Sequence, residues 1–161
     1  MPFFTGEHEQ TIGAKRRLAI NSALREEQQM GDGDQYYLVL GPDKHLWLYP
    51  DEYYRRLATS MKRSLLPSRQ VAKMSMFFAM ARLLKPDAQG RVVLPEKSLQ
   101  RAKLDVVENV TLVGKGDHIE IWPTNEWEAF VGDALGSYED MLYEAAERLE
   151  DQVQQRDTDS V

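Results

Sequence analysis

The chain has 161 residues, 42% of them hydrophobic and 29% charged, a composition typical of a soluble globular protein of one ordinary domain or two small fused ones. It has no cysteine, which excludes disulfides, thiolate metal sites and cysteine nucleophiles. The first ten residues lack the pattern of a signal peptide, and no apolar run approaches the roughly 20 residues that span a bilayer, so we expect a cytoplasmic protein without a membrane partner.

The formal net charge of −6 is unevenly distributed along the chain. Residues 1–124 hold 18 of the 20 Lys and Arg but only 15 of the 26 Asp and Glu, a balance of +3. Residues 125–161 hold the other two bases and 11 acids, a balance of −9. Because the local field matters more than the net charge for a polyanion, this sequence is compatible with a nucleic-acid partner.

Two similar series of elements are predicted one after the other. Each has a polar strand, a second strand, a short helix and a hairpin. In the first series Gly41 to Lys44 form the hairpin turn, Pro50 ends its last strand, and Asp51 is expected to cap the next helix. The predicted ranges are 7–12, 17–20, 22–29 and 36–41 with 45–49, and then 80–86, 91–94, 96–103 and 109–113 with 118–122.

Sequence similarity at a spacing of 73 residues supports this duplication. LWLYP of residues 46–50 matches IEIWP of residues 119–123, and the same spacing aligns His45 with His118. Several matches in one order indicate two copies of one module. We therefore predict module 1 at 7–54, linking helices at 55–79, module 2 at 80–124 and an acidic C-terminal helical region at 125–161.

Apolar residues at helical spacing lie between the modules and in the C-terminal region. The run that opens at Pro67-Ser68 carries Val71, Met74, Phe77, Phe78 and Ala81, which we interpret as core packing rather than a ligand groove. In the C-terminal region one stripe among the acids is typical of a docking helix. Its members are Leu142, Ala145, Leu149 and Val153.

The loop DAQGR of the second module places Asp87 and Arg91 on either side of three residues. Gly90 is third in the loop, where a three-residue hairpin loop needs a left-handed residue. On one interpretation the Asp87–Arg91 pair only staples the turn. The first module reads GAKRR from Gly13 to Arg17, without the aspartate or the loop glycine but with three consecutive bases. Such a projecting loop suits phosphate contact, and arginine can also read guanine edges.

The stretch DAQGRVVLP resembles the signature of the SpoVT/AbrB swapped-hairpin DNA-binding modules. Two such modules with aromatic-proline strand ends (Tyr49-Pro50 and Trp122-Pro123) resemble the MraZ family over about residues 3 to 130. The resemblance implies an α+β fold in which two tandem swapped-hairpin modules form a pseudo-twofold β-barrel, with flanking helices and a C-terminal helix. It also implies a transcriptional regulator, usually a repressor of its own division and cell-wall operon. Such regulators bind promoter repeats as ring-shaped homo-oligomers and associate with the nucleoid.

The family's D-x-x-x-R motif maps fully onto Asp87 and Arg91, but in the first module only Arg17 maps, with Gly13 in place of the aspartate and Asn21 in place of the later proline. The resemblance implies no cofactor, metal or small-molecule substrate. It implies DNA contact from the two turns and, more weakly, from the helices that follow them, with Asp87 and Gly90 as structural residues of the motif. The candidate DNA-binding residues are Lys15, Arg16, Arg17, Lys85, Gln89, Arg91, Arg25 and Arg101.

Two other function classes compete with DNA binding. An enzyme is disfavoured because no G-x-S-x-G or H-E-x-x-H motif occurs. Asp117 and His118 could be proposed as a catalytic pair, but the matching position in the first module is His45 beside Lys44, and both histidines are expected at the start of a hairpin strand. The second alternative is an antitoxin-like or protein-interaction module on the same fold. Such modules usually occur singly with a disordered tail, and a neighbouring toxin gene would favour that alternative.

Overall fold

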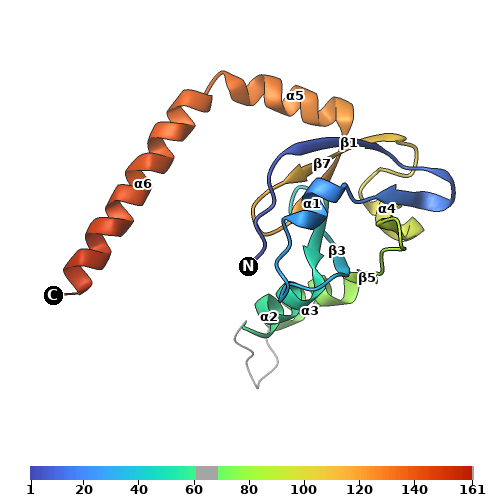
Figure 1. Ribbon diagram of the computed structural model, residues 1–161, viewed down its shortest axis with the longest axis horizontal. Coiled ribbons are helices and arrows are strands. Elements are labelled where there is room, and N and C mark those ends of the chain that lie inside the picture. The colour runs from blue at the N-terminus through green and yellow to red at the C-terminus, as the bar shows by residue number, and fades with distance from the viewer. Residues whose placement is uncertain (61–68, 161) are drawn as a thin grey trace. The chain divides into compact units, whose positions relative to one another are not determined.

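The computed structural model describes residues 1–60 and 69–160, which have an α+β architecture of antiparallel strands and helices (Figure 1). The first series of elements is β1 (Glu7–Thr11), η1 (Ala14–Arg16), β2 (Arg17–Ala19), α1 (Ser22–Glu26), β3 (Tyr36–Leu40), β4 (Leu46–Pro50) and α2 (Asp51–Thr59). The second series is α3 (Arg69–Met80), β5 (Arg82–Leu84), β6 (Arg91–Val93), α4 (Glu96–Arg101), β7 (Asn109–Gly114), β8 (Ile119–Pro123) and α5 (Thr124–Leu135). A last helix, α6, spans Tyr138–Asp159.

The chain divides into two units, Met1–Thr124 and Asn125–Val161. The first unit contains all strands of both series, so the two predicted modules share one body. The second contains most of α5 and all of α6. Among the described helices none combines the length and the apolar character needed to cross a bilayer.

The strands of the two series exchange partners. One sheet has the order β1-β7-β8-β4-β3-β5, and β2 pairs with β6 in a separate ladder. The first strand of each series therefore pairs with the third strand of the other, β1 with β7 and β5 with β3. Exchanging every strand for its counterpart in the other series leaves both orders unchanged. Within the described residues the sheet ends at β1 and β5, and its hydrogen bonds do not close a barrel.

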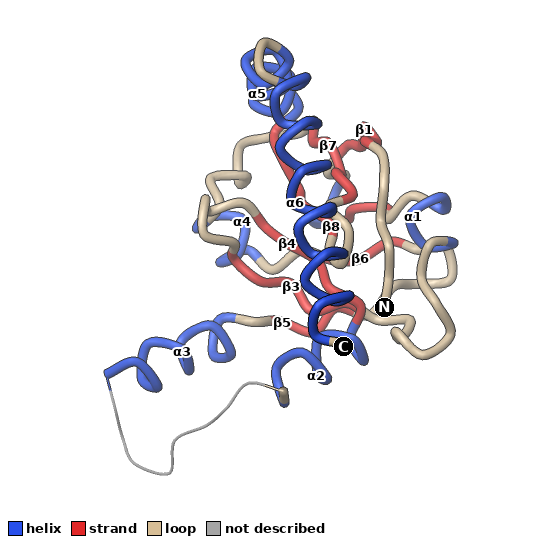
Figure 2. Tube along the Cα trace, turned by 90° about the vertical axis from the view of Figure 1, so that its left-hand side faces the viewer, coloured by secondary structure: helices blue, strands red, loops and turns tan. Residues whose placement is uncertain are grey.

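The core forms where the alternating faces of these strands meet. Leu38 of β3 and Leu48 of β4 are buried while their neighbours are partly exposed, the period-2 pattern of half-buried strands. The short helices α1 and α4 lie on opposite sides of the unit in Figure 2 and each adds one buried leucine, Leu24 and Leu99. Helices α2 and α3 lie at the end where β3 and β5 run (Figures 1 and 2).

Several predicted boundaries and one predicted cap differ from the structure. Helix α1 ends at Glu26 rather than residue 29, and α4 ends at Arg101, shortly before Lys103 adopts a left-handed φ of 56° that cannot continue a helix. The prediction that Asp51 caps α2 was wrong, because Pro50 holds the N-cap position. The Asp51 carboxylate instead accepts the backbone N–H of Gln35 at 3.2 Å and ties down the start of β3.

The interpretation of the α3 aromatic residues as core packing was wrong. Phe77 is 61% exposed, and together with Phe78 it lines a groove against the sheet. Helical periodicity identified the apolar side chains, but it does not show that Phe77 keeps most of its surface exposed. The predicted helix start at Pro67-Ser68 and the side chains of Val71 and Met74 lie outside what the structure describes.

Two histidines are built into the β4–β8 junction. His45 stacks on Trp122 and His118 stacks on Trp47, with ring centroids 3.8 and 4.0 Å apart. The ring nitrogens of His118 bond to Asp117 Oδ1 at 2.8 Å and Glu120 Oε2 at 2.9 Å. Both ring nitrogens of His118 therefore already have hydrogen-bond partners, so neither is free to act as the general base of an Asp117–His118 catalytic pair. Nor do the described residues contain a cluster of three or more His, Asp or Glu able to hold a metal ion.

Burial and hydrogen bonding act in opposite directions on the His118–Glu120 pair. Burial lowers the pKa of His118, but the bonds to Glu120 and Asp117 outweigh it and raise that pKa above its ordinary 6.5. Burial raises the pKa of Glu120, but the bonds from His118 and Trp122 outweigh it and leave the pKa below its ordinary 4.5. The pair is therefore held in its charged form between these two values.

We expect the stability of the first unit to fall as the pH rises above neutrality. Because the pKa of His118 is raised on folding, its contribution is fully present below pH 6.5 and is lost as the pH rises through the folded-state pKa. Urea denaturation from about pH 6 to about pH 8 should show a falling free energy of unfolding, and His118→Gln should flatten that slope. His8→Gln, on β1, is the control that should keep it; an unchanged slope in His118→Gln contradicts the assignment.

Candidate nucleic-acid interface

The two turns that carry the candidate residues close in the same way. In the first turn the backbone N–H of Gly13 donates to the carbonyl of Arg17 at 2.8 Å, and in the second the N–H of Asp87 donates to Arg91 at 2.8 Å. Each closure leaves three residues in the loop, as the sequence predicted. The strands that leave the turns, β2 and β6, then pair antiparallel with Leu18 opposite Val92.

Each turn is also bonded to the other series. The N–H of Leu94 donates to the carbonyl of Arg16 at 2.9 Å, and the N–H of Ile20 donates to the carbonyl of Gly90 at 2.9 Å. The residue that follows each strand therefore holds the turn that precedes the opposite strand. These two bonds fix both turns to the ends of one three-residue ladder.

The ladder directs Arg17 and Arg91 to the same side. Leu18 and Val92 have no exposed surface and face the core. Their neighbours along the strands point the other way, because side chains alternate across a strand. Arg17 is exposed and Arg91 partly exposed on this outer face, at diagonally opposite corners of the ladder.

The second turn has the stapled geometry that one reading of the sequence gave it. Asp87 Oδ1 accepts the backbone N–H of Gln89 at 2.9 Å and of Arg91 at 3.0 Å, and Oδ2 accepts Arg91 Nε at 2.9 Å. The backbone N–H of Arg91 is the main cause that lowers the pKa of Asp87. Gly90 has the expected positive φ, 78°. The pair remains partly exposed, so the staple leaves Arg91 and Gln89 accessible from solvent.

The first turn reaches the same closure without a carboxylate or a glycine. Lys15 and Arg16 both have left-handed φ values, 59° and 60°, which cost about 1–2 kcal/mol for each such residue. Arg16 Nε donates to the carbonyl of Leu94 at 3.0 Å, which offsets part of that cost. Left-handed backbone conformations of non-glycine residues cluster at functional sites, which makes this turn a functional candidate.

Arg25 belongs with the turns, although the sequence made it a weaker candidate. Its Nε donates to the carbonyl of Ile20 at 3.1 Å, just as Arg16 Nε donates to Leu94 at the other ladder end. A Cβ on Gly90 would lie 2.6 Å from Arg25 Cζ, so the absent side chain of Gly90 makes room for the guanidinium. The only sequence signal for this role was a base on the short helix after the motif.

The remaining candidates differ in their surroundings. Arg101 borders a small cavity beside Met80 and Leu38, and among the described residues no hydrogen bond or ion pair links it to either turn. Lys85 is exposed on the segment that enters the second turn. Within residues 1–60 and 69–160, neither hydrogen bonds nor ion pairs engage the side chains of Lys15, Arg17 and Lys85. These cations are therefore available to an anionic partner.

Comparison with known proteins identifies relatives of this chain. A family model described as "MraZ protein, putative antitoxin-like" matches residues 77–154. Proteins named transcriptional regulator MraZ from Carboxydothermus hydrogenoformans and Pelotomaculum thermopropionicum are 32% and 33% identical, over 92% of this chain and 97% and 96% of the relatives. One from Finegoldia magna is 29% identical over 86% of this chain and 93% of the relative. These matches confirm the resemblance seen in the sequence and extend it beyond residue 130 into α6.

We expect Gly90→Ala to cost more stability than its backbone conformation alone explains. The left-handed φ should cost about 1–2 kcal/mol, and the new methyl group should also displace Arg25. Gly116→Ala is a matched control, because Gly116 has a similar φ of 81° but no atom within 4 Å of the added Cβ. Urea denaturation of Gly90→Ala with and without Arg25→Ala should show that removing Arg25 relieves the excess. Equal losses for Gly90→Ala and Gly116→Ala would contradict this contact.

Proposed function

The chain belongs to the MraZ family, and we propose that it is a transcriptional regulator that binds double-stranded promoter DNA through the two turns of the β2–β6 ladder. The names of its relatives supply the regulatory role. The observation that carries DNA binding is the placement of Arg17 and Arg91 on one outer face of the ladder. The proposed function is binding without catalysis.

The proposed interface separates positioning from sequence reading. Lys15 and Arg17 are unpaired within the described chain, so they suit phosphate contacts, which fix the register of a protein on the duplex. Arg91 is held in one orientation by Asp87, and an oriented guanidinium suits bidentate reading of a guanine edge. Gln89, Lys85 and the anchored Arg16 and Arg25 extend the surface around these three residues.

One subunit offers few contacts, so the proposal includes assembly. A handful of phosphate contacts supports only weak non-specific binding, with Kd about 10⁻⁴ to 10⁻⁶ M. A ring-shaped homo-oligomer would present several pairs of turns to several promoter repeats, and linked sites multiply affinity. We propose repression of the protein's own division and cell-wall operon, in the cytoplasm and in association with the nucleoid. The acidic C-terminal region would then lie away from the DNA, because it would repel phosphate.

We propose that residues 7–54 and 80–124 are two AbrB-like modules that exchange hairpins around a pseudo-twofold axis to form a barrel-like body. The exchanged pairing of β1 with β7 and of β5 with β3 supports this arrangement. The pairing of β2 with its counterpart β6, and of β4 with its counterpart β8, supports it as well.

An antitoxin-like role is the second candidate function, and the description of the matched family model favours it. In that role the same fold would bind a small toxin protein as well as DNA. A toxin gene next to this one would favour this candidate, whereas neighbouring division genes would favour the operon regulator.

We expect Arg17→Ala to abolish binding to the promoter while the oligomer persists. Arg17 is exposed and unpaired within the described residues, so its removal takes away an anion contact without disturbing the core. A gel-shift assay on the upstream region of the gene measures the affinity, and light scattering measures the assembly. Arg101→Ala is the comparison variant and, as the weaker candidate that borders a cavity apart from the turns, should lose clearly less affinity. Unchanged affinity of Arg17→Ala would rule out the ladder face as the interface.

We also expect the affinity for DNA to fall steeply with salt. Each phosphate contact releases counterions, so the logarithm of the binding constant should fall linearly with the logarithm of salt concentration, by about 0.9 per contact. Titrations between about 50 and 200 mM salt should show this slope, and Lys15→Ala should reduce it by about one contact for each turn engaged. A flat salt dependence in the wild type would exclude phosphate contacts as the basis of binding.

A further inference from the structure

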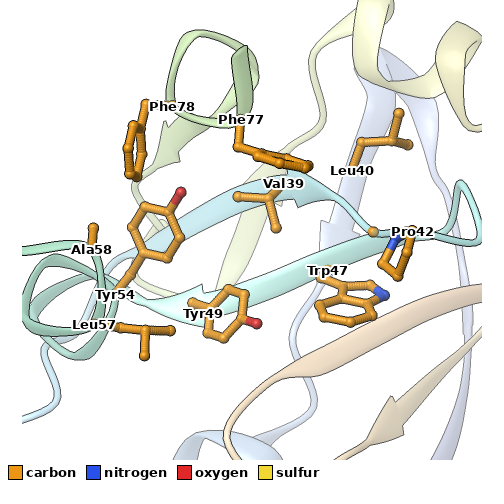
Figure 3. A pocket seen from close by; sticks show the side chains of 11 residues that line it. Val39, Leu40, Pro42, Trp47, Tyr49, Tyr54, Leu57, Ala58, Phe77 and Phe78 are labelled. Atoms are coloured by element: carbon orange, nitrogen blue, oxygen red, sulfur yellow. The ribbon is translucent and has the colours of Figure 1, made fainter. Parts of the chain in front are cut away.

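An apolar groove lies on the first unit, on the outer side of the β3–β4 hairpin. Val39 of β3 and Trp47 and Tyr49 of β4 form its floor, Tyr54 and Leu57 of α2 form one wall, and Phe77 of α3 reaches over it (Figure 3). Its volume is about 210 Å³, below the roughly 300–1,000 Å³ of small-molecule pockets. The groove therefore suits a row of protruding side chains better than an enclosed ligand.

The second unit carries an apolar surface of matching kind. Leu142, Leu149 and Val153 of α6 are 54%, 63% and 57% exposed. They recur with Ala145 at the spacing of one helical face, over about 17 Å of helix axis. A helix of this length takes most of its stability from packing of its apolar face, so this stripe requires a partner. The family-model match runs to residue 154 and includes it.

Two features decide between the possible partners of this stripe. Helix α6 carries eight acids and two bases, a net charge of −6, so two such helices packed together would repel each other. Residues 1–124, which bear the groove, have a balance of +3. In addition, a ring needs a head-to-tail interface made of two different surfaces, because a self-complementary surface closes after two subunits. The groove and the stripe are two such different surfaces on one chain.

We propose that the groove of one copy of the chain is filled by the apolar stripe of α6 from a second copy. Leu149 of the incoming helix packs among Phe77, Trp47 and Tyr54, and the interface repeats from copy to copy. Arg55, which lies over the ring of Tyr37 at 5.6 Å, is already paired with Glu52 at 2.6 Å, so the apolar side chains of the groove are what hold the incoming helix. The inference deepens the proposed function, since it rests on the ring assembly, and it identifies the surfaces that build the ring.

The absence of native cysteine makes this contact directly testable by disulfide crosslinking. Phe77→Cys and Leu149→Cys are made as separate single variants, one with a size tag, and are co-expressed so that they assemble together. After mild oxidation, a non-reducing gel should show a Phe77→Cys to Leu149→Cys heterodimer as the main crosslinked product. Disulfides form only when the Cα atoms approach to within about 7 Å, so the product reports docking between chains.

Matched controls lie on the opposite faces of the same helices. Ser75→Cys on α3 and Glu147→Cys on α6 are each two residues away and about 160° around the helix axis, and we expect them to crosslink at least about tenfold less. As a second measurement, Leu149→Glu should shift the oligomer to smaller species in light scattering, whereas Glu147→Ala should not. Because Leu149 is exposed on the isolated chain, Leu149→Glu leaves the fold of the first unit intact.

Three results would overturn the proposal. One is a homodimer of Leu149→Cys as the main product, which means that α6 pairs with α6. Another is a crosslink that forms only within single chains of the double variant, which means that α6 folds into its own groove. The third is no crosslink above the controls. If the wild type still binds the promoter with a steep salt dependence in these cases, the docking model fails and the DNA-binding function stands. If the crosslink forms but the wild type does not bind the promoter, the docking model stands and the DNA-binding function fails.

Discussion

The reciprocal bonding between each turn and the opposite series is the constraint on which the rest of the structure depends. The β2–β6 ladder has three residues on each side and would be weak alone. It is held by the complete burial of Leu18 and Val92, and by the bonds from Leu94 to Arg16 and from Ile20 to Gly90. Because backbone groups make these bonds, the distance between the two turns is set by the ladder rather than by flexible side chains. This fixed separation suits the proposed binding of both turns to a repeating phosphate backbone.

The two turns reach equivalent positions by different chemistry. In the second turn Asp87 binds backbone N–H groups and Gly90 accepts the left-handed conformation, so no strain is stored there. The first turn has neither residue, and Lys15 and Arg16 adopt left-handed backbones instead. An arginine caps the carbonyl at both ladder ends, from helix α1 in one case and from the turn itself in the other. The first turn has Arg16 where the second has Gly90. The Leu94 carbonyl is therefore bonded by an arginine of the turn, whereas the Ile20 carbonyl is bonded by an arginine of helix α1, and Arg16 also adds positive charge to the face.

Periodicity and turn residues predicted the local structure, whereas the exchange of strand partners was expected only from the family resemblance. Local periodicity predicted the order of the strands and helices, the 73-residue spacing indicated the duplication, and Gly90 predicted the three-residue closure of the second turn. The exchange of strands between the series was invisible in the pattern, because alternation shows which face of a strand is buried and not which strand lies beside it. The same limit explains the error at Phe77, where periodicity marks an apolar face without showing what covers it. Asp51 was misassigned because a carboxylate at a helix start can cap the helix or accept a distant N–H equally well.

Assembly decides whether a surface of this size can regulate transcription. Non-specific contacts from one subunit correspond to a Kd of about 10⁻⁵ M, too weak to occupy one promoter among many competing sites. If a neighbouring subunit on the same ring meets an adjacent repeat at an effective concentration of about 10⁻³ M, two linked subunits reach about 10⁻⁷ M and three reach about 10⁻⁹ M. The gain depends on rigid placement of the turns within each subunit, which the ladder supplies, and on rigid contact between subunits. In the proposed docking, an apolar groove and an acidic helix would suit the second task, because they would join the chains without using the cations of the two turns.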